Sequence, residues 1–537
     1  MSNWGPALQV GLATIAMLAA WGCATPSTQE PQEPVRDEAR ARARFGEGPP
    51  SRVLLLTVAG LVPSNYLDPF GHAAGEGALV HMPELARLAR EGVTGLAAFA
   101  PSPGATRATH ATLVTGAGPA RHGIVADVTL EEEGAWIAPR VDSRLLRGVT
   151  LWDAALGRGV VALDWPMTAG ARIEMLLPEP GGDGSGSWLE RVRAGTSPVV
   201  MRILDEIAEE AGRDASSEAA ALGGVAWPDA RERDAAKVEV ACRLLGSERQ
   251  AGLWLVRLDQ TRPVLQASGI GTVDLDEALA RIDAEIGRLV GCFQAAGRLS
   301  DTAIFVTGDV AFQPVHTRVA PNVALVKSGL IGRDPRASGG VRSWLALVLS
   351  NGRSAYVYAR DEANAVEARE VLRVEAVRTG AFRVVSATEL AEVGGDPQAW
   401  FGLVAEPGYV LGDSLTGPVL RPASRRAAAG GLRGPQAQED DSAVGFVAWG
   451  RGIRNSVRVP TLELTSVAPT IAALLGLRLD EDLEEAPLIG ILRSATAPPP
   501  PGPRRLDGSR RTLEERARAR RELRAVEGRS GADRLEP

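Results

Sequence analysis

The sequence has no internal repeat, and beyond its N-terminus it has no apolar run long enough to cross a lipid bilayer. It also lacks an excess of positive charge: 59 basic and 66 acidic residues leave a net charge of −7, which does not favour nucleic acid as a partner. The remaining composition, 45% hydrophobic and 23% charged, is ordinary for a folded globular protein. A chain of 537 residues can form one large α/β domain with an inserted subdomain, or two to three smaller domains.

Cysteine is scarce, with three residues in the whole chain. Cys242 and Cys292 lie in apolar-periodic, helical contexts, VEVACRLL and GRLVGCFQ. We therefore expect buried free thiols rather than a catalytic pair. A disulfide between them stays open, because sequence does not show whether two cysteines are close in space.

The N-terminus differs from the rest of the chain. Residues 7–20 (ALQVGLATIAMLAA) form an apolar segment that is followed by Trp21, Gly22 and Cys23. This pattern resembles a bacterial lipoprotein signal, which implies a diacylated Cys23 as the new N-terminus and an exported, envelope-bound protein. The alternatives are a plain secretory signal or a short anchor. In a cell with two membranes, Ala24 after the lipidated cysteine is consistent with the periplasmic face of the outer membrane.

Strand and helix patterns alternate from Ser51 onward. Continuous apolar runs such as RVLLLTV (52–58) are typical of central strands that are buried on both faces. Further buried strands are expected at 160–163, 253–258 and 302–307, and helices at 82–91, 198–211, 234–245 and 275–296. The alternation predicts an α/β fold with a mostly parallel sheet covered by helices.

Composition divides the chain further. We expect a signal peptide at 1–23, a disordered linker at 24–50, a first core part at 51–314 and an inserted cap subdomain of mixed short strands at 315–424. The core resumes over 425–492. The Pro-rich and then highly charged tail at 493–537 is predicted to be disordered.

The segment ATRATHATLVTGAGPARHGI (105–124) carries the strongest indication of chemistry. Thr106 follows a loop that contains proline and glycine, and it opens an apolar run that ends at Gly116. A hydroxyl at a helix N-terminus lies where free backbone N–H groups and the helix dipole favour a phosphoryl or sulfuryl oxyanion. The structural alternative is that Thr106 is only an N-cap.

Several segments together resemble the alkaline phosphatase superfamily, in particular its type I phosphodiesterase/nucleotide pyrophosphatase branch. The matching pieces are RVLLLTVAGL, MPELARLAREGV, THATLVTGAGPARHGI, LDWPMTAGARIEMLLPE, LARIDAEIGRLV, FVTGDVAFQPVH, LVAEPGYVLGD and VAPTIAALLGL. The resemblance implies a three-layer sandwich with a mostly parallel central sheet and an inserted α+β cap subdomain. It also implies phosphoester hydrolysis by a Thr or Ser nucleophile, here Thr106, between two zinc ions held by six carboxylate or imidazole ligands.

The expected ligands are largely missing. The positions that match the family's ligand motifs are Ala59, Arg262, Gln266, Asp309, Val310 and Arg433, so only one carboxylate of six remains. A guanidinium keeps its proton in proteins and repels a cation. We therefore predict no zinc and no other cofactor, which makes Thr106 a vestigial nucleophile position.

Few residues could replace the metal as activator of Thr106. His110 lies about one helical turn after Thr106, and the resemblance implies a structural role for it. His316, close in sequence to Asp309, and Asp259, at a strand end, are weaker candidates. The remaining histidines, His72, His81 and His122, have no catalytic signal.

Arginines accompany the lost ligands. Arg107, Arg262 and Arg433 map to the rim or floor of the pocket beside Thr106. One hypothesis is that they replace the zinc charge and form a metal-free anion site, because the arginine fork matches phosphate or carboxylate. The alternative is that Arg262 or Arg433 pairs with Asp309 and closes the pocket.

Three functions remain open. The first is an envelope-tethered pseudoenzyme, anchored to the membrane through Cys23, that binds a phosphate-containing or other anionic small molecule or a protein partner. The second is a hydrolase that still works through Thr106 with unorthodox activation. The third is an assembly module with a vestigial pocket.

Overall fold

The computed structural model describes residues 48–493, apart from residues 69, 74–79, 102–103, 128–141, 182–186, 215–228, 248–249, 335, 337–339, 424–427, 431–442 and 482. The predicted signal peptide, Cys23, most of the predicted linker, Arg433 and the tail from residue 494 therefore lie outside the described residues. Within them, no helix is both long and apolar enough to span a membrane.

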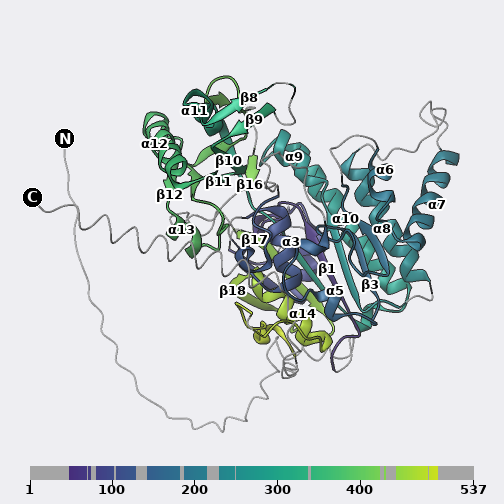
Figure 1. Cartoon of the computed structure of the whole chain (residues 1–537). Coiled ribbons are helices and arrows are strands. Elements are labelled where there is room, and N and C mark those ends of the chain that lie inside the picture. Colours follow the sequence, from purple (N-terminus) through teal and green to yellow (C-terminus); the bar gives the residue numbers. More distant parts are fainter. Residues whose placement is uncertain are drawn as a thin grey trace, which may run out of the picture.

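An eight-stranded sheet forms the centre of the molecule, in the order β18-β2-β17-β6-β1-β5-β3-β4 (Figure 1). β1 pairs in parallel with β5 and β6, while β17 is antiparallel to both of its neighbours. The mostly parallel sheet confirms the predicted α/β class. Its strands are β1 (Arg52–Val58), β2 (Val93–Phe99), β3 (Val160–Trp165), β4 (Met175–Pro178), β5 (Leu253–Leu258), β6 (Thr302–Gly308), β17 (Ala443–Gly450) and β18 (Val457–Glu463).

Helices cover both faces of the sheet because alternate residues of each central strand point to opposite sides. In β1, Leu54 and Leu56 enter one apolar cluster, and Val53 and Leu55 enter the other. The first cluster includes side chains of α2 (Pro83–Glu91), α6 (Trp188–Arg193), α7 (Pro198–Asp214), α8 (Ala230–Gly246) and α10 (Val273–Ala295). The second includes side chains of α3 (Thr106–Thr115), α5 (Leu151–Ala154) and α14 (Val467–Leu475). The remaining core helices are α4 (Pro119–His122) and α9 (Thr261–Ala267).

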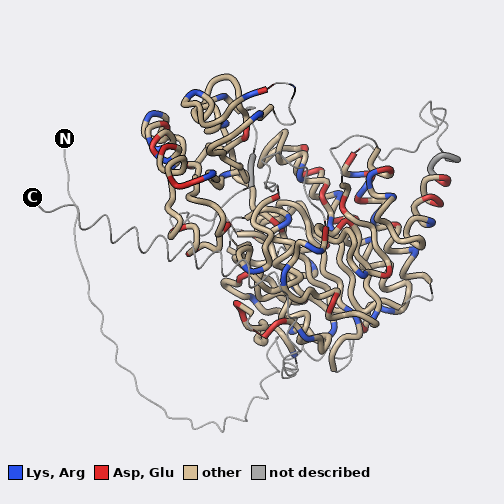
Figure 2. Tube along the Cα trace, viewed as in Figure 1, with Lys and Arg blue, Asp and Glu red and all other residues tan. Residues whose placement is uncertain are grey.

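A cap subdomain is inserted between β6 and β17, as the fold prediction required. Its antiparallel sheet has the order β10-β11-β13-β12 and its own apolar cluster. Figure 2 shows acidic and basic residues alternating along its helix α12, where Arg373 and Arg378 pair with acids three residues earlier. The cap elements are α11 (Pro321–Lys327), α12 (Glu362–Thr379), α13 (Ala387–Glu392), β8 (Ile331–Arg333), β9 (Val341–Trp344), β10 (Ala346–Asn351), β11 (Ser354–Ala359), β12 (Phe382–Val385) and β13 (Phe401–Ala405). A third sheet beside it contains β7 (Phe312–Val319), β14 (Gly408–Leu411), β15 (Leu420–Pro422) and β16 (Ala428–Gly430).

The two internal cysteines form a disulfide, so the expectation of free thiols is wrong. Cys242 on α8 and Cys292 on α10 are bonded, with their Cα atoms 5.3 Å apart. The apolar contexts correctly placed both residues on packed helices. These local contexts could not reveal that α8 and α10 pack against each other with the two cysteines in contact. The two residues are 50 positions apart in the sequence.

We predict that removal of this bond destabilises the protein. Cross-linking residues 50 positions apart restricts the unfolded chain, so the double variant Cys242→Ala/Cys292→Ala should lose about 2–4 kcal/mol of unfolding free energy. Urea unfolding with and without dithiothreitol measures the loss. The double variant serves as the control and should not respond to the reductant; a wild-type protein that also fails to respond would contradict the prediction.

Candidate functional site

The site lies at the carboxyl edge of the sheet, where the parallel strands β1, β5 and β6 end side by side. The residues that follow these strands are Ala59, Asp259 and Asp309, which therefore meet at one edge. Gly60, just after Ala59, donates its backbone N–H to Asp309 Oδ1 at 3.1 Å. The parallel register thus brings together residues that are 50 to 250 positions apart.

Arg262 lies between the two carboxylates of this edge. Its Nε donates to Asp259 Oδ1 at 2.7 Å, and its Nη2 donates to Asp309 Oδ2. The other oxygen of Asp309 accepts the N–H groups of Gly60 and of Val310, the latter at 2.7 Å. Asp309 is 1% exposed, so the guanidinium neutralises a buried charge. The alternative in which Arg262 pairs with Asp309 is confirmed.

The other described ligand positions carry groups that are not usual zinc ligands. Ala59 and Val310 are buried alkyl side chains, and Gln266 is an exposed amide one turn after Arg262 on α9. Arg433 lies outside the described residues. Within the described part of the chain, no three His, Cys, Asp or Glu side chains are grouped so that they could hold a metal ion.

A carboxylate occupies the N-terminus of α3. Asp127 accepts the backbone N–H groups of Thr106, at 3.3 Å, and of Arg107, at 2.7 Å. These two backbone N–H groups are among those that the sequence-based hypothesis assigned to a bound oxyanion. The N-cap residue is Ala105 and Thr106 is the first helical residue, so the interpretation of Thr106 as the N-cap is wrong. Sequence reasoning missed Asp127, because only the path of the loop after α4 brings it back to α3.

Arg107 is also paired. Its Nε and Nη2 donate to the two oxygens of Glu179 at 3.2 and 2.8 Å, and its Nη1 donates to the carbonyl of Asp127 at 2.7 Å. Glu179 is 4% exposed and also accepts the N–H of Met167. Sequence reasoning missed Glu179 as well, since it follows β4, 72 residues after Arg107.

Both ring nitrogens of His110 contact groups other than the Thr106 hydroxyl. Its Nδ1 lies 2.7 Å from the Thr106 carbonyl oxygen, its Nε2 lies 2.8 Å from Thr57 Oγ1, and its ring packs edge-on against Trp165. Burial lowers the pKa of His110 to about 4, and the positive charge of Arg257 acts in the same direction against the opposing charge of Asp309. His110 is therefore a neutral, structural residue.

The remaining histidines do not enter the site. His122 is buried against Thr112 and the backbone of Ile124, as expected for a packing residue. His316 is exposed on β7, where its Nδ1 lies 2.9 Å from the Thr317 hydroxyl. His72 and His81 lie on the surface beside Asp68 and Asp276.

A second group of buried charges lies next to the loop after β5. Lys237 Nζ lies 2.8 Å from Asp164 Oδ2 and 2.6 Å from Asp234 Oδ1. Arg257 contacts the other oxygen of Asp164 at 3.0 Å, and Asp234 accepts the N–H of Asp259. Burial opposes ionisation of Asp259. The positive charges of Arg262, Arg257 and Lys237 outweigh this effect and hold its pKa below the usual range.

We predict that the Arg262 side chain balances the charge of Asp309. Arg262→Met should lower the unfolding free energy by about 3 kcal/mol, because it leaves a buried carboxylate without its partner. The double variant Arg262→Met/Asp309→Asn should recover a large part of that loss. Urea unfolding of both single variants and the double variant measures the coupling; strictly additive losses would contradict the ion pair.

Acid should destabilise the protein through its buried imidazoles. The folded-state pKa of His110, about 4, lies below its ordinary value of 6.5, so its stabilising contribution is complete above pH 6.5 and is lost as the pH falls toward 4. Urea unfolding between pH 7.5 and 4 should show this slope. His110→Gln should reduce it by up to about 1.4 kcal/mol per pH unit. Exposed His316→Gln is the control, and an unchanged slope in His110→Gln would refute the assignment.

The structure places a threonine at a helix N-terminus in the core that also holds two aspartates at the carboxyl edge of the sheet. The family model for type I phosphodiesterase / nucleotide pyrophosphatase matches residues 53–412, and the chain belongs to that family.

Solved structures support the same fold. The human ectonucleotide pyrophosphatase / phosphodiesterase 5 is 14% identical, with a TM-score of 0.55 over 82% of this chain and 100% of that chain. The murine protein 5 gives the same identity and TM-score over 82% of this chain and 100% of its own. The inactive threonine-to-alanine variant of the murine protein, in complex with AMP, also has 14% identity and a TM-score of 0.55, over 82% of this chain and 97% of its own. At this identity the likeness shows the fold alone. A search of curated protein sequences finds no match to the chain.

Proposed function

We propose that this protein is a metal-free, non-hydrolytic member of the type I phosphodiesterase family, tethered to a cell envelope through Cys23 and kept for binding rather than turnover. The observation that carries the proposal is the position of the Arg262 guanidinium between Asp259 and Asp309. A fixed organic cation supplies positive charge next to the one remaining ligand carboxylate.

The donor groups of the edge do not fit zinc. Zinc sites use thiolate, imidazole and carboxylate ligands, whereas the described family positions offer two alkyl groups, an amide, a guanidinium and one carboxylate. That carboxylate already accepts hydrogen bonds on both oxygens. A divalent ion at Asp309 would lie against the guanidinium of Arg262, and their repulsion would offset the attraction of the carboxylate.

Thr106 has no base among the described contacts of the site. Both nitrogens of His110 are engaged by Thr57 and by the Thr106 carbonyl. Lys237 is buried among acids and the carbonyl of Arg257. The Asp127 carboxylate at the start of α3 would also repel an incoming phosphoryl group. These contacts argue against the hydrolase hypothesis.

The same contacts bear on the anion-pocket hypothesis. Arg107 is paired with Glu179, and Arg262 is paired with two aspartates. Both guanidinium groups therefore already bind a carboxylate. AMP is bound in the structure of the murine relative's inactive variant. In this chain an anion at the carboxyl edge of the sheet would have to compete with three carboxylates. The geometry therefore favours a partner bound elsewhere on the protein over a nucleotide in this pocket.

The disulfide supports the proposed export. Disulfides persist in oxidising compartments such as the bacterial periplasm and are rare in the cytosol. The Cys242–Cys292 bond joins α8 to α10 within the core. It is therefore consistent with an exported protein that carries a lipid on Cys23.

Metal content and turnover test the proposal together. Purified full-length protein, equilibrated with zinc and freed of excess metal, should retain far less than one zinc per chain by elemental mass spectrometry. Its turnover of bis-p-nitrophenyl phosphate should equal that of Thr106→Ala, with an active family enzyme as the positive control. Two zincs per chain, together with turnover that disappears in Thr106→Ala, would overturn the proposal.

A further inference from the structure

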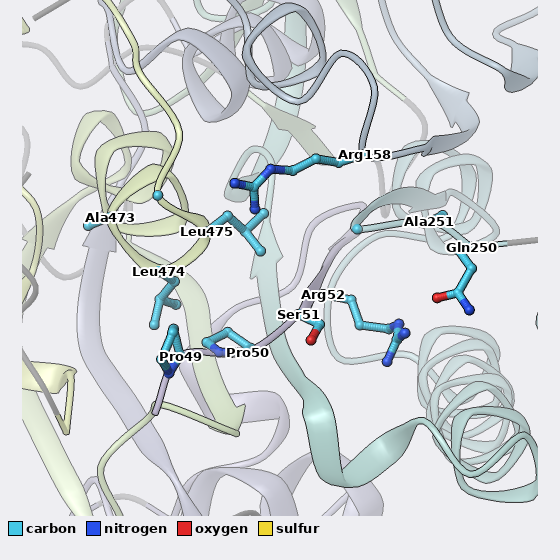
Figure 3. A pocket seen from close by; sticks show the side chains of 12 residues that line it. Pro49, Pro50, Ser51, Arg52, Arg158, Gln250, Ala251, Ala473, Leu474 and Leu475 are labelled. Atoms are coloured by element: carbon cyan, nitrogen blue, oxygen red, sulfur yellow. The ribbon is translucent and has the colours of Figure 1, made fainter. Parts of the chain in front are cut away.

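A hollow lies at the opposite end of the sheet from Thr106, at the amino ends of β1, β3 and β5 (Figure 3). Its volume is about 650 Å³. Arg52, Arg158 and Gln250 contribute polar side chains, while Pro49, Leu474 and Leu475 contribute apolar ones. In Figure 3 the Arg158 side chain extends toward Leu475, and those of Arg52 and Gln250 lie on the other side of the hollow.

The described residues that line this hollow include two arginines and no acid. Arg158 is exposed, and it forms no ion pair with a carboxylate of the described residues. Asp301 is shared between Arg52, at 3.4 Å, and Arg451, at 3.6 Å. Burial and the positive charge of Arg298 lower the pKa of Arg52 despite the opposing charge of Asp301. Arg52 and Arg451 therefore both contact Asp301, and Arg158 does not.

Part of the lining of this hollow is apolar. Pro49 and Pro50 contribute to it, together with Leu474 and Leu475 from the end of α14. A hollow lined by arginine and by apolar side chains fits a ligand that joins an anionic group to a less polar one. The planar fork of arginine binds phosphate oxygens in pairs, which makes phosphate the suitable anion.

The position of the hollow indicates the source of that phosphate. The chain enters the core through Pro49 and Pro50, which themselves line the hollow. If Cys23 carries the lipid, only the 27 residues 24–50 separate it from this end of the core. Even a fully extended segment of that length spans at most roughly 95 Å. This step rests on the proposed tether.

We propose that this hollow binds a phosphate-bearing group, and that in the tethered protein the group is the headgroup of an anionic phospholipid. Arg158 holds the phosphate oxygens, and the proline and leucine side chains contact the glycerol end. Binding here turns the tethered end of the core toward the membrane and the edge with Thr106 away from it.

Titration of short-chain lipids tests the proposal. Purified, processed full-length protein in neutral detergent is titrated with dihexanoyl-phosphatidylglycerol, dihexanoyl-phosphatidylcholine and inorganic phosphate by calorimetry. The phosphatidylglycerol should bind tightest, and Arg158→Gln should weaken it at least tenfold. The matched control is Arg144→Gln, which removes a surface arginine paired with Asp142 and should leave the affinity unchanged.

The outcomes separate the possibilities. Absence of phosphatidylglycerol binding, or binding that Arg158→Gln leaves unchanged, overturns the site. Equal binding of inorganic phosphate overturns the lipid assignment and makes free phosphate the ligand. The tether is tested separately by the mass of the N-terminal peptide with and without a diacylglyceryl group on Cys23. The titration in detergent does not use that anchor, so its result stands whatever the peptide mass shows.

Discussion

The site depends on one guanidinium placed between two carboxylates. Asp309 is buried at the end of β6, and a buried carboxylate is stable only with a counter-charge and hydrogen bonds. Arg262 supplies the charge, while the N–H groups of Gly60 and Val310 supply the bonds. Because arginine stays protonated in proteins, this balance does not depend on an ion from solution. The positive charge that balances Asp309 is therefore carried by a side chain of the protein itself.

Two further ion-pair groups extend this arrangement into the fold. Glu179 joins α3 to the loop after β3, and Asp164, near the end of β3, joins that strand to α8 and β5. The end of β3 and the following loop contain two non-glycine residues with positive φ, Asp164 at 58° and Met167 at 62°. Such conformations cost free energy and persist only where surrounding contacts hold them. The ion pairs of Asp164 and the hydrogen bond from Met167 to Glu179 provide those contacts, so this edge contributes to the structure of the core.

Much of the fold was predictable because it follows from local patterns. The apolar run 52–58 is β1, and the helix expected at 275–296 is α10. The opposite charges of Arg262 and Asp309 also made their pairing one of the two alternatives stated from the sequence. The partners of Arg107 could not be predicted, because Glu179 lies 72 residues away and only the β3–β4 register brings it to α3. Asp127, Lys237 and the Cys242–Cys292 bond were hidden for the same reason: each depends on which loops and helices pack together.

The proposed function is that this chain keeps the fold of the type I phosphodiesterase family while Arg262 takes the place of a metal beside Asp309. The most direct test is anomalous diffraction at the zinc absorption edge, from crystals grown with zinc in excess. This account predicts no zinc peak within bonding distance of Asp309 and a guanidinium in contact with its carboxylate. A zinc peak bound to Asp309, with Arg262 displaced from it, would contradict the account.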